Sequence, residues 1–569
     1  MTSFEFVLTG SLEKVMPKSA PKAECLDRKV LFQNQRWSFQ LAYLCRNDDQ
    51  RQTPTDFSVR CTGDAASAAV LRCVQLVPCE YPCHGTWDDR YLTTAPGLLP
   101  DLLRPAAWGE TLRGVPAQWR SLWITVDAAA LPPGGHELFL EAYGPGEELL
   151  ERFAVVLHVL DKALPPQTLY HTEWFHADCL ADYYHVKVFS EEHWKIIENF
   201  IAGAAAHSVN MLLTPVFTPP LDTFEGGERT PIQLVDIVWD GKEYRFDFSR
   251  LRRWVMICRE HRITEIEVAH LFTQWGANCA PNIWVNTPDG PEKRFGWHTP
   301  AVGGEYTVFL RAFLPELKLE LDRLVGLSHV WFHISDEPSV QDKQSYLAAK
   351  ASVEDFLSGC HIIDALSDYS FYREEIVKQP VVSCDHLQTF ADHHVSGLWT
   401  YYCTAQALQV PNRFIAMPST RNRVLGVLLY LYEISGFLHW GFNFYNVRGS
   451  LHPIDPFRVT DAGLAFPSGD AFLVYPGENG EAWESIRGEV LKEALQDLRL
   501  LRLAEETVGR QRVLNLLGEL FQDMSFINYP GDKSFFEALW NGCGELCYPS
   551  IPWSDTFPTE NTSRKTKGM

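Results

Sequence analysis

The chain has 569 residues, of which 46% are hydrophobic and 13% aromatic, and it carries a formal net charge of −22. This length exceeds what one core can use, so we expect roughly two to four domains. The acidic balance argues against nucleic acid or an anionic membrane surface as partner, because both require basic patches. No apolar run reaches about 18 residues, so no insertion into a membrane is expected.

The chain start, MTSFEFVLTGSLEKVMPKSAP, lacks the basic and then apolar order of a secretion signal. We therefore predict a cytoplasmic protein whose fourteen cysteines are reduced thiols. The pairs Cys79/Cys83 and Cys543/Cys547 each have three residues between them, a spacing that by itself is weak evidence for zinc. The stretch CDHLQTFADHH at 384–394 matches no standard zinc pattern. No glycine-rich nucleotide loop is found either. We predict no metal and no cofactor.

Residues 1–165 are predicted to form an all-β sandwich domain. Short runs rich in β-favouring residues lie at 36–45, 68–77, 121–128, 136–144 and 151–160. Turns such as LPPGGH and YGPGEE separate them, which is the spacing typical of a sandwich. The stretch DKALPPQT at 161–168 reads as a linker.

Residues 166–480 are predicted to form an α/β (β/α)8 barrel, the catalytic domain. Eight strand candidates lie at 169–176, 208–217, 263–272, 329–335, 361–368, 380–385, 396–403 and 435–445. Amphipathic helical patterns separate most of them, at 190–207, 249–261, 306–326, up to about 358, and 421–434. Long insertions at 218–247 and 273–305 would lie on the face that carries active sites. Residues 481–569 are assigned to a C-terminal helical extension and tail, with a helix over 481–506.

Polar and aromatic residues collect where the predicted strands end. Each one, taken singly, is explained equally well by a structural role. Because the carboxyl ends of barrel strands meet at one rim, their coincidence predicts a binding site there. They are His176, Asp178, Thr214, Gln274, Trp275, Tyr369, Asp385, His386, Tyr401, Tyr402, Trp440 and Asn443.

Two adjacent acids, Asp336 and Glu337, end the fourth strand in HVWFHISDEPS at 329–339. The pair also suits the first turn of a helix. Conventional glycosidases hold two carboxyls on either side of the scissile bond, whereas neighbours in an extended chain point in opposite directions. The pair can instead divide the work: Glu337 serves as general acid and base, and Asp336 orients a 2-acetamido group of the substrate that acts as nucleophile.

Two other functions stay open. A conventional two-carboxylate glycosidase needs a nucleophile on strand seven, where GLWTYYCTA has none, although Glu433 or Asp385 could supply it. A catalytically silent carbohydrate-binding protein is the second alternative, since aromatic side chains stack on sugars. Ser335 lacks the glycine frame of a nucleophile elbow, so a serine hydrolase is not expected.

The motif SDEP, with LLTPVFTPPLDT, GLWTYYC, GFLHWGFNFY and VYPGENGEAWESIR, resembles glycoside hydrolase family 123 over residues 1–506, most specifically over 169–490. The resemblance implies a β-sandwich followed by a (β/α)8 barrel, and a retaining β-N-acetylgalactosaminidase with substrate-assisted catalysis. It implies a carbohydrate partner bearing a terminal N-acetylhexosamine, on a glycan or a glycolipid. Asp336 and Glu337 map onto the catalytic pair, Tyr401 or Tyr402 onto a contact with the acetamido oxygen, and Trp440 and Trp275 onto stacking aromatics. The predicted substrate-binding set also includes His176, Asp178, Tyr369, Asp385 and Asn443.

Overall fold

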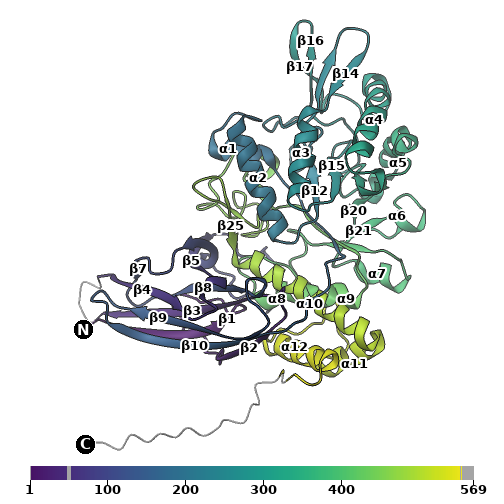
Figure 1. Ribbon diagram of the computed structural model, residues 1–569. Coiled ribbons are helices and arrows are strands. Elements are labelled where there is room, and N and C mark those ends of the chain that lie inside the picture. Colours follow the sequence, from purple (N-terminus) through teal and green to yellow (C-terminus); the bar gives the residue numbers. More distant parts are fainter. Residues whose placement is uncertain (1, 48–52, 552, 554–569) are drawn as a thin grey trace, which may run out of the picture.

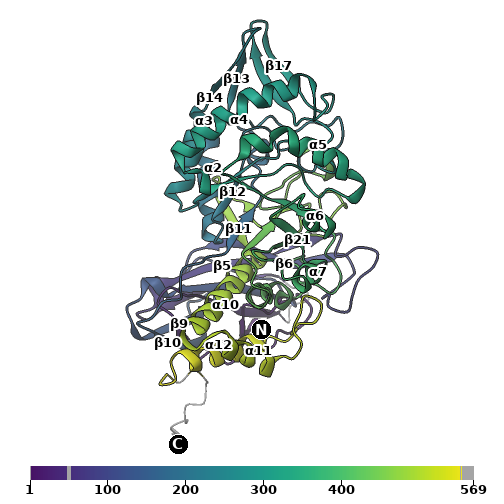
Figure 2. The same ribbon diagram turned by 90° about the vertical axis from the view of Figure 1, so that its right-hand side faces the viewer.

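A computed structural model describes residues 2–47, 53–551 and 553. In both ribbon views the N-terminal sheets lie at one end, the barrel in the middle, and a small sheet at the far end (Figure 1, Figure 2). The predicted polar tail at 558–569 lies outside the described residues. Among the residues described, no helix has the length and apolarity needed to cross a bilayer.

The N-terminal region is all-β, as predicted, and consists of two sheets. Its strands alternate in burial: in β9, Leu138, Leu140 and Ala142 are buried while the residues between them are more exposed. The first sheet holds β1 (Thr2–Gly10), β3 (Arg36–Asn47), β8 (Trp119–Asp127), β5 (Ala69–Cys79) and β6 (Gly97–Ala106). The second holds β2 (Arg28–Leu31), β10 (Leu149–Val159), β9 (Gly134–Tyr143), β4 (Thr55–Thr62) and β7 (Leu112–Gly114).

The first of these sheets is completed by a hairpin from much later in the chain. Strands β24 (Tyr475–Pro476) and β25 (Ala482–Ser485) follow the barrel, and β25 pairs antiparallel with β6. The sequence pattern assigned the residues of β25 to the start of the helix predicted over 481–506. The helix begins after them, as α10 (Ile486–Val508), where the Ser485 side chain accepts a hydrogen bond from the Gly488 N–H.

The catalytic region is a nearly closed parallel barrel, which confirms the predicted barrel in outline. Its nine strands are β19, β18, β15, β12, β11, β23, β22, β21 and β20 in spatial order. The two end strands, β19 and β20, are separated only by Ile363 in the chain, so the sheet runs almost completely round. The bounds are β11 Tyr170–Glu173, β12 Met211–Thr214, β15 Glu265–Val268, β18 Val330–Phe332, β19 His361–Ile362, β20 Asp364–Leu366, β21 Pro380–Ser383, β22 Trp399–Tyr401 and β23 Gly436–His439.

Helices lie between these strands along the chain. Ser190 caps α2 through the His193 N–H at 3.2 Å, as the sequence indicated. Helices α6 and α7, before and after strand β21, have only 4 and 6 residues. The bounds are α1 Ala177–Tyr184, α2 Glu191–Ala206, α3 Ser249–Glu260, α4 Gly304–Leu324, α5 Lys343–Val353, α6 Ser370–Arg373, α7 Leu387–Asp392, α8 Ser419–Arg423 and α9 Leu425–Leu431.

The two long insertions meet in a separate four-stranded sheet, which the sequence did not reveal. Strands β13 (Asp236–Trp239) and β14 (Tyr244–Asp247) form one hairpin, and β16 (Ile283–Thr287) and β17 (Gly290–Phe295) form another. The hairpins join through β13 and β16. Figures 1 and 2 show this sheet projecting from the barrel on the side away from the N-terminal sheets.

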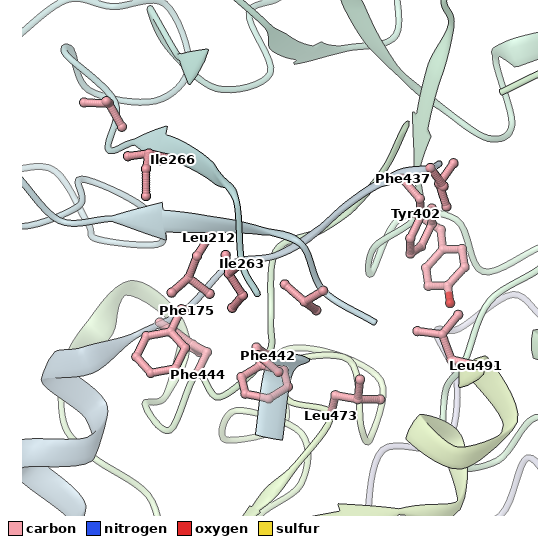
Figure 3. Packing of buried hydrophobic residues seen from close by; sticks show 14 of the residues in the cluster. Phe175, Leu212, Ile263, Ile266, Tyr402, Phe437, Phe442, Phe444, Leu473 and Leu491 are labelled. Atoms are coloured by element: carbon pink, nitrogen blue, oxygen red, sulfur yellow. The ribbon is translucent and has the colours of Figure 1, made fainter. Parts of the chain in front are cut away.

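Alternation along the barrel strands separates two apolar layers. Met211 and Leu213 of β12 pack inside the barrel with Trp331 and Trp399. Leu212, between them, points outward into the layer beneath the helices, where Figure 3 shows it among other buried residues such as Ile266, Phe437 and Phe442. The same alternation decides which polar residues of each strand face the inside of the barrel.

Helix α10 joins the barrel to the N-terminal sheets. It packs against α8, α9, β6 and β25, and also against α12 (Ser534–Cys547), while α11 (Arg510–Leu520) follows it directly. Its Arg487 forms an ion pair with Asp101 of β6 at 2.9 Å, and both side chains are almost fully buried. The boundaries at residues 165 and 480 stay a prediction.

Candidate active site

The adjacent acids Asp336 and Glu337 lie just beyond the end of β18, where the backbone is held from both sides. The Asp364 carboxylate of β20 accepts the N–H groups of Ile334 and Ser335 at 3.0 and 3.2 Å. On the other side the Ser335 hydroxyl donates to the Thr273 carbonyl at 2.8 Å. The Trp275 N–H donates to the carbonyl of Asp336 at 2.9 Å. The chain before the pair is therefore fixed by its neighbours on either side.

Glu337 adopts a left-handed backbone conformation, with φ of +44°. This region is unfavourable for residues other than glycine and marks sites where surrounding contacts impose strain. The extended geometry expected from sequence would point the two acids in opposite directions. The turn at Glu337 changes that outcome, because both Asp336 and Glu337 now line one cavity.

The cavity opens to solvent and encloses about 630 Å³. Its walls are largely aromatic and apolar, with a few polar groups, which is the usual character of a small-ligand site. Trp275 stands at its edge with half of its surface exposed. The lining residues are Trp174, Leu221, Asp222, Gln274, Trp275, Asp336, Glu337, Ala365, Tyr401, Cys403, Thr404, Leu438, Trp440 and Phe466.

Both acids of the pair hold their protons more strongly than ordinary carboxyls. Burial raises the pKa of Asp336 well above its usual value, and the neighbouring Glu337 carboxylate raises it further, against the opposing effect of His333. Burial also raises the pKa of Glu337; a hydrogen bond from Tyr401 lowers it and nearby Asp385 raises it. The pair therefore resists full ionisation, because each additional negative charge would be buried in the same cavity.

Tyr401 is the direct partner of Glu337. It lies at the end of β22, and its hydroxyl donates to Glu337 Oε1 at 2.5 Å. A hydrogen bond to the charged form of a carboxyl stabilises that form. The arrangement is suited to a group that gives up a proton and later takes one back.

A charged histidine lies beneath the pair. His333 Nε2 is 2.6 Å from Glu267 Oε1, and its Nδ1 is 3.5 Å from Asp364 Oδ1. Burial lowers the pKa of His333, but hydrogen bonds and charge from Asp364 and Glu267 outweigh this and raise it to about 9. Glu267 also accepts from Trp174 Nε1 at 2.7 Å, so this group orients an aromatic wall of the cavity.

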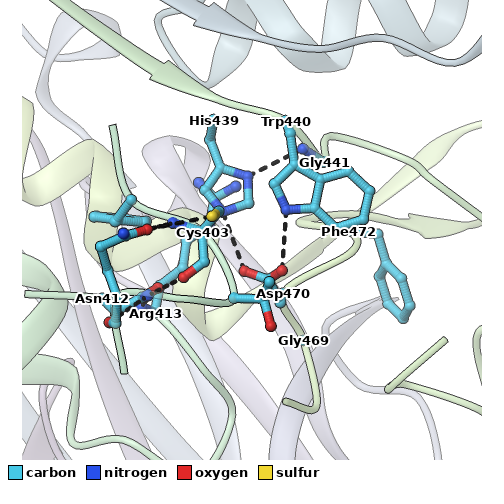
Figure 4. A network of polar contacts seen from close by, with 12 residues as sticks. Cys403, Asn412, Arg413, His439, Trp440, Gly441, Gly469, Asp470 and Phe472 are labelled. Carbon is cyan, nitrogen blue, oxygen red and sulfur yellow. Dashed lines mark hydrogen bonds and ion pairs between the residues drawn. The ribbon is translucent and has the colours of Figure 1, made fainter. Parts of the chain in front are cut away.

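Trp440 is held by an acid that the sequence did not single out. Its indole Nε1 donates to Asp470 at 3.0 Å, and the same carboxylate faces His439 Nε2 at 3.6 Å (Figure 4). Deeper in the barrel, Arg413 makes two hydrogen bonds to Glu173, at 2.6 and 2.7 Å. The hydrogen bond to Asp470 restricts rotation of the Trp440 ring, which lines the cavity.

The structure brings together six of the predicted site residues in the cavity: Asp336, Glu337, Tyr401, Trp440, Trp275 and Gln274. Tyr402, the next residue along, points the other way because successive side chains of a strand alternate. It is fully buried, and its hydroxyl reaches Asn422 at 3.3 Å. Of the two tyrosines, only Tyr401 faces the catalytic pair.

The other predicted site residues lie behind or beside the cavity. Asp178 and His176 both contact Arg229, at 2.8 and 3.0 Å, and Asn443 hydrogen-bonds the backbone of His176. Arg229 in turn donates to the carbonyl of Leu221, a lining residue, at 3.0 Å, so this cluster supports the wall. The Asp385 carboxylate accepts a hydrogen bond from Gln406 Nε2 at 3.2 Å. Tyr369 stacks on His393 with ring centres 4.4 Å apart, away from the lining.

Several residues of the site were missed from sequence. They are Trp174, Asp222, Cys403, Thr404 and Phe466 in the lining, and Glu267, His333, Asp364, Arg229 and Asp470 behind it. Acids inside predicted strands were a usable signal for Glu267 and Asp364, because a buried acid requires a partner. No comparable signal marked Asp222 or Thr404, which lie on loops.

A second cavity of about 650 Å³ lies between the N-terminal sheets and α12. Its charged groups are matched internally, for example Glu493 with the Ser11 hydroxyl at 2.8 Å and Lys533 with Glu13 at 3.1 Å. In the described part of the chain, no group of three or more His, Cys, Asp or Glu is placed to hold a metal. The cavity at the strand ends is therefore the stronger candidate.

Comparison with known proteins agrees with this location. The family model of the glycoside hydrolase 123 catalytic domain matches residues 174–504. A solved structure of a family 123 glycoside hydrolase from Clostridium perfringens, described in terms of glycolipid glycan hydrolysis, superposes with a TM-score of 0.73 at 14% identity, covering 96% of this chain and 97% of that one.

Other solved structures are far less similar. A Parabacteroides merdae β-glucuronidase has a TM-score of 0.31 at 9% identity, covering 87% of this chain and 52% of its own. A putative β-galactosidase from Bacteroides fragilis has a TM-score of 0.30 at 8% identity, with coverages of 85% and 60%. No curated protein matches the chain significantly.

Proposed function

Because the chain belongs to glycoside hydrolase family 123, we propose that it removes terminal β-linked N-acetylgalactosamine from glycans or glycolipids by substrate-assisted, retaining catalysis. Membership makes it a glycosidase that acts on carbohydrate. The sugar and the mechanism are the proposed part. The observation that supports them is that Asp336 and Glu337, adjacent in sequence, line the same cavity.

In the proposed first step the substrate supplies the nucleophile. Asp336 accepts a hydrogen bond from the acetamido N–H, and the acetamido oxygen attacks the anomeric carbon. The bond from that carbon to the leaving oxygen breaks while Glu337 passes its proton to the oxygen. The ring that forms carries positive charge, which the Asp336 carboxylate stabilises. The raised pKa of Glu337 keeps its proton available for this step.

The second step reverses these roles. Glu337, now ionised, takes a proton from water, whose oxygen attacks the anomeric carbon and reopens the ring. Two inversions at one carbon give net retention. His333 opposes the rise in the pKa of Asp336. In the proposed step the positive charge that develops on the acetamido group stabilises the ionised form of Asp336, because an opposite charge nearby favours a carboxylate. Trp440 and Trp275 provide faces on which a sugar can stack.

A conventional two-carboxylate mechanism remains the alternative, and the structure adds a candidate for its nucleophile. Asp222 also lines the cavity, with one oxygen accepting the Gly449 N–H at 3.0 Å. Burial raises the pKa of Asp222. Burial raises the pKa of Asp336 as well, so the direction of these pKa shifts does not distinguish the two mechanisms, and the substrate comparison below does.

The wider architecture is included in the proposal. Counting β19 and β20 as one interrupted strand gives the eight strands of a (β/α)8 barrel, between a sandwich at 1–165 and a helical extension at 481–569. A cytoplasmic location accords with fourteen free thiols, eight of which lie in or against the two apolar clusters of the barrel: Cys79, Cys179, Cys258, Cys360, Cys384, Cys403, Cys543 and Cys547.

The experiment compares matched aryl glycosides: N-acetyl-β-galactosaminide, N-acetyl-β-glucosaminide and β-galactoside. We expect turnover of the first, slower turnover of the second and almost none of the third, because the 2-hydroxy sugar lacks the internal nucleophile. A thiazoline derived from the acetamido sugar should bind far more tightly than substrate, since it resembles the cyclic intermediate. Similar kcat/KM on the acetamido and hydroxy galactosides would refute the mechanism and favour Asp222 as nucleophile.

A further inference from the structure

The loop between β5 and β6 (residues 80–96, here the sandwich loop) extends from the N-terminal sheets onto the barrel. His84 Nε2 lies 2.8 Å from the Thr404 carbonyl, and the Tyr91 hydroxyl donates to the Ala407 carbonyl at 2.9 Å. Further along, Asp88 accepts the Gln409 N–H at 2.6 Å and pairs with Arg421 at 2.9 Å. Three of these barrel partners lie in the connection from β22 to α8, and the fourth, Arg421, lies in α8 itself.

That connection supplies one wall of the cavity, formed by Cys403 and Thr404. It has internal bonds as well: the Cys403 N–H donates to Gln406 Oε1 at 3.0 Å, and Asn412 Nδ2 donates to the Cys403 carbonyl at 2.8 Å. At Thr404 the backbone carbonyl is supported by His84 of the sandwich loop. The wall is thus held partly by its own loop and partly by the other domain.

His84 is well oriented for this contact. The Tyr81 hydroxyl lies 2.9 Å from its Nδ1, and the Thr404 carbonyl lies 2.8 Å from its Nε2. A neutral imidazole that accepts at Nδ1 and donates from Nε2 satisfies both contacts. The Tyr81 ring meets the imidazole edge-on, at a centroid distance of 5.6 Å, which restricts rotation of the ring.

The wall lies beside Glu337: after burial, the Glu337 carboxylate raises the pKa of the Cys403 thiol the most, and Asp336 raises it less. Tyr401, whose hydroxyl donates to Glu337, comes two residues before Cys403 in the chain. The group that protonates the leaving oxygen faces the leaving group, so side chains beside it meet the aglycone rather than the cleaved sugar.

We propose that the sandwich loop positions the Cys403–Thr404 wall through His84 and thereby sets which leaving groups the enzyme accepts. His84 is a positioning residue, since its described contacts are with Tyr81 and Thr404. The selectivity part rests on the proposed function. The positioning part does not, because it concerns only the order of residues 403–412 in the free protein.

The first test is hydrogen exchange in the free protein, followed by mass spectrometry of peptides that span 399–412. His84→Ala should speed exchange in this segment, and His84→Gln, which keeps a side-chain N–H donor, should restore much of the protection. Gln496→Ala is the matched control, because Gln496 bridges α10 to the backbone of Arg36 at 2.8 and 3.0 Å elsewhere on the domain interface. Equal exchange in wild type and His84→Ala would overturn the positioning role.

The second test compares kcat/KM on an aryl N-acetyl-β-galactosaminide with that on an oligosaccharide ending in the same sugar. His84→Ala should lower the oligosaccharide value about threefold to tenfold more than the aryl value, as expected for one lost hydrogen bond. The thiazoline fills only the cleaved-sugar side of the cavity and does not reach the wall that His84 holds. Its affinity for His84→Ala should therefore stay within about twofold of that for wild type. Equal losses on both substrates would overturn the selectivity role. If the wild-type enzyme cleaves neither substrate, the proposed function fails, and the exchange result alone decides whether His84 positions the wall.

Discussion

Replacing Tyr401 by Phe removes the hydroxyl that donates to Glu337 at 2.5 Å and leaves the ring in the cavity wall. A hydrogen bond to a charged group contributes about 1.5–3 kcal/mol. The bond matters most when Glu337 is ionised, which is the state that develops as the proton leaves. We therefore expect kcat on a substrate with a poor leaving group to fall by about tenfold or more, since 1.4 kcal/mol is a factor of ten.

The pH profile gives a sharper readout. The Tyr401 hydrogen bond lowers the pKa of Glu337, so its loss should raise that pKa and keep the acid protonated to higher pH. The alkaline limb of kcat/KM should move upward by about one pH unit, because 1.36 kcal/mol corresponds to one unit. Tyr402→Phe is the matched control: it removes a neighbouring hydroxyl that reaches Asn422 in the core. A limb that stays in place or moves downward in Tyr401→Phe would refute the reasoning.

Three further outcomes are expected. Asp336→Asn should lower kcat strongly with little change in KM, because the amide still touches the substrate but cannot stabilise the developing positive charge; a rise in KM alone would contradict this. Glu337→Gln should lose about 10²–10⁴-fold on poor leaving groups and much less on activated aryl glycosides; equal loss on both would exclude the acid role. Arg413→Leu should destabilise the fold by about 3–5 kcal/mol by leaving Glu173 buried without its partner; an unchanged midpoint of thermal unfolding would show that the pair contributes little.

The barrel was predictable because its strands are short apolar runs between amphipathic helices. All eight candidates contain a strand or, at 361–368, two strands divided by Ile363. The sheet from the two insertions was not predictable in the same way. Its hairpins pair across forty residues of chain, from β13 to β16, and nothing local in either one specifies the other. The pairing of β25 with β6 is a longer-range case of the same difficulty.

The site was predictable as a set of residue types at strand ends, but not as a geometry. The adjacency of Asp336 and Glu337 was visible, whereas the left-handed turn that brings both into one cavity depends on Asp364, Ser335 and the loop at Trp275. Strand alternation could separate Tyr401 from Tyr402 only once the inner face of β22 was known.

The late hairpin and the buried ion pair between Asp101 and Arg487 have a consequence for biosynthesis. Asp101 and Arg487 are 386 positions apart in the chain, so a ribosome needs roughly 20–80 s to travel from one to the other. Throughout that interval strand β6 has an open edge where β25 will later pair, and Asp101 has no guanidinium beside it. The first domain to emerge is therefore finished by almost the last part of the chain to be made. A fragment that ends at residue 165 keeps both defects permanently, whereas one that extends through α10 repairs both.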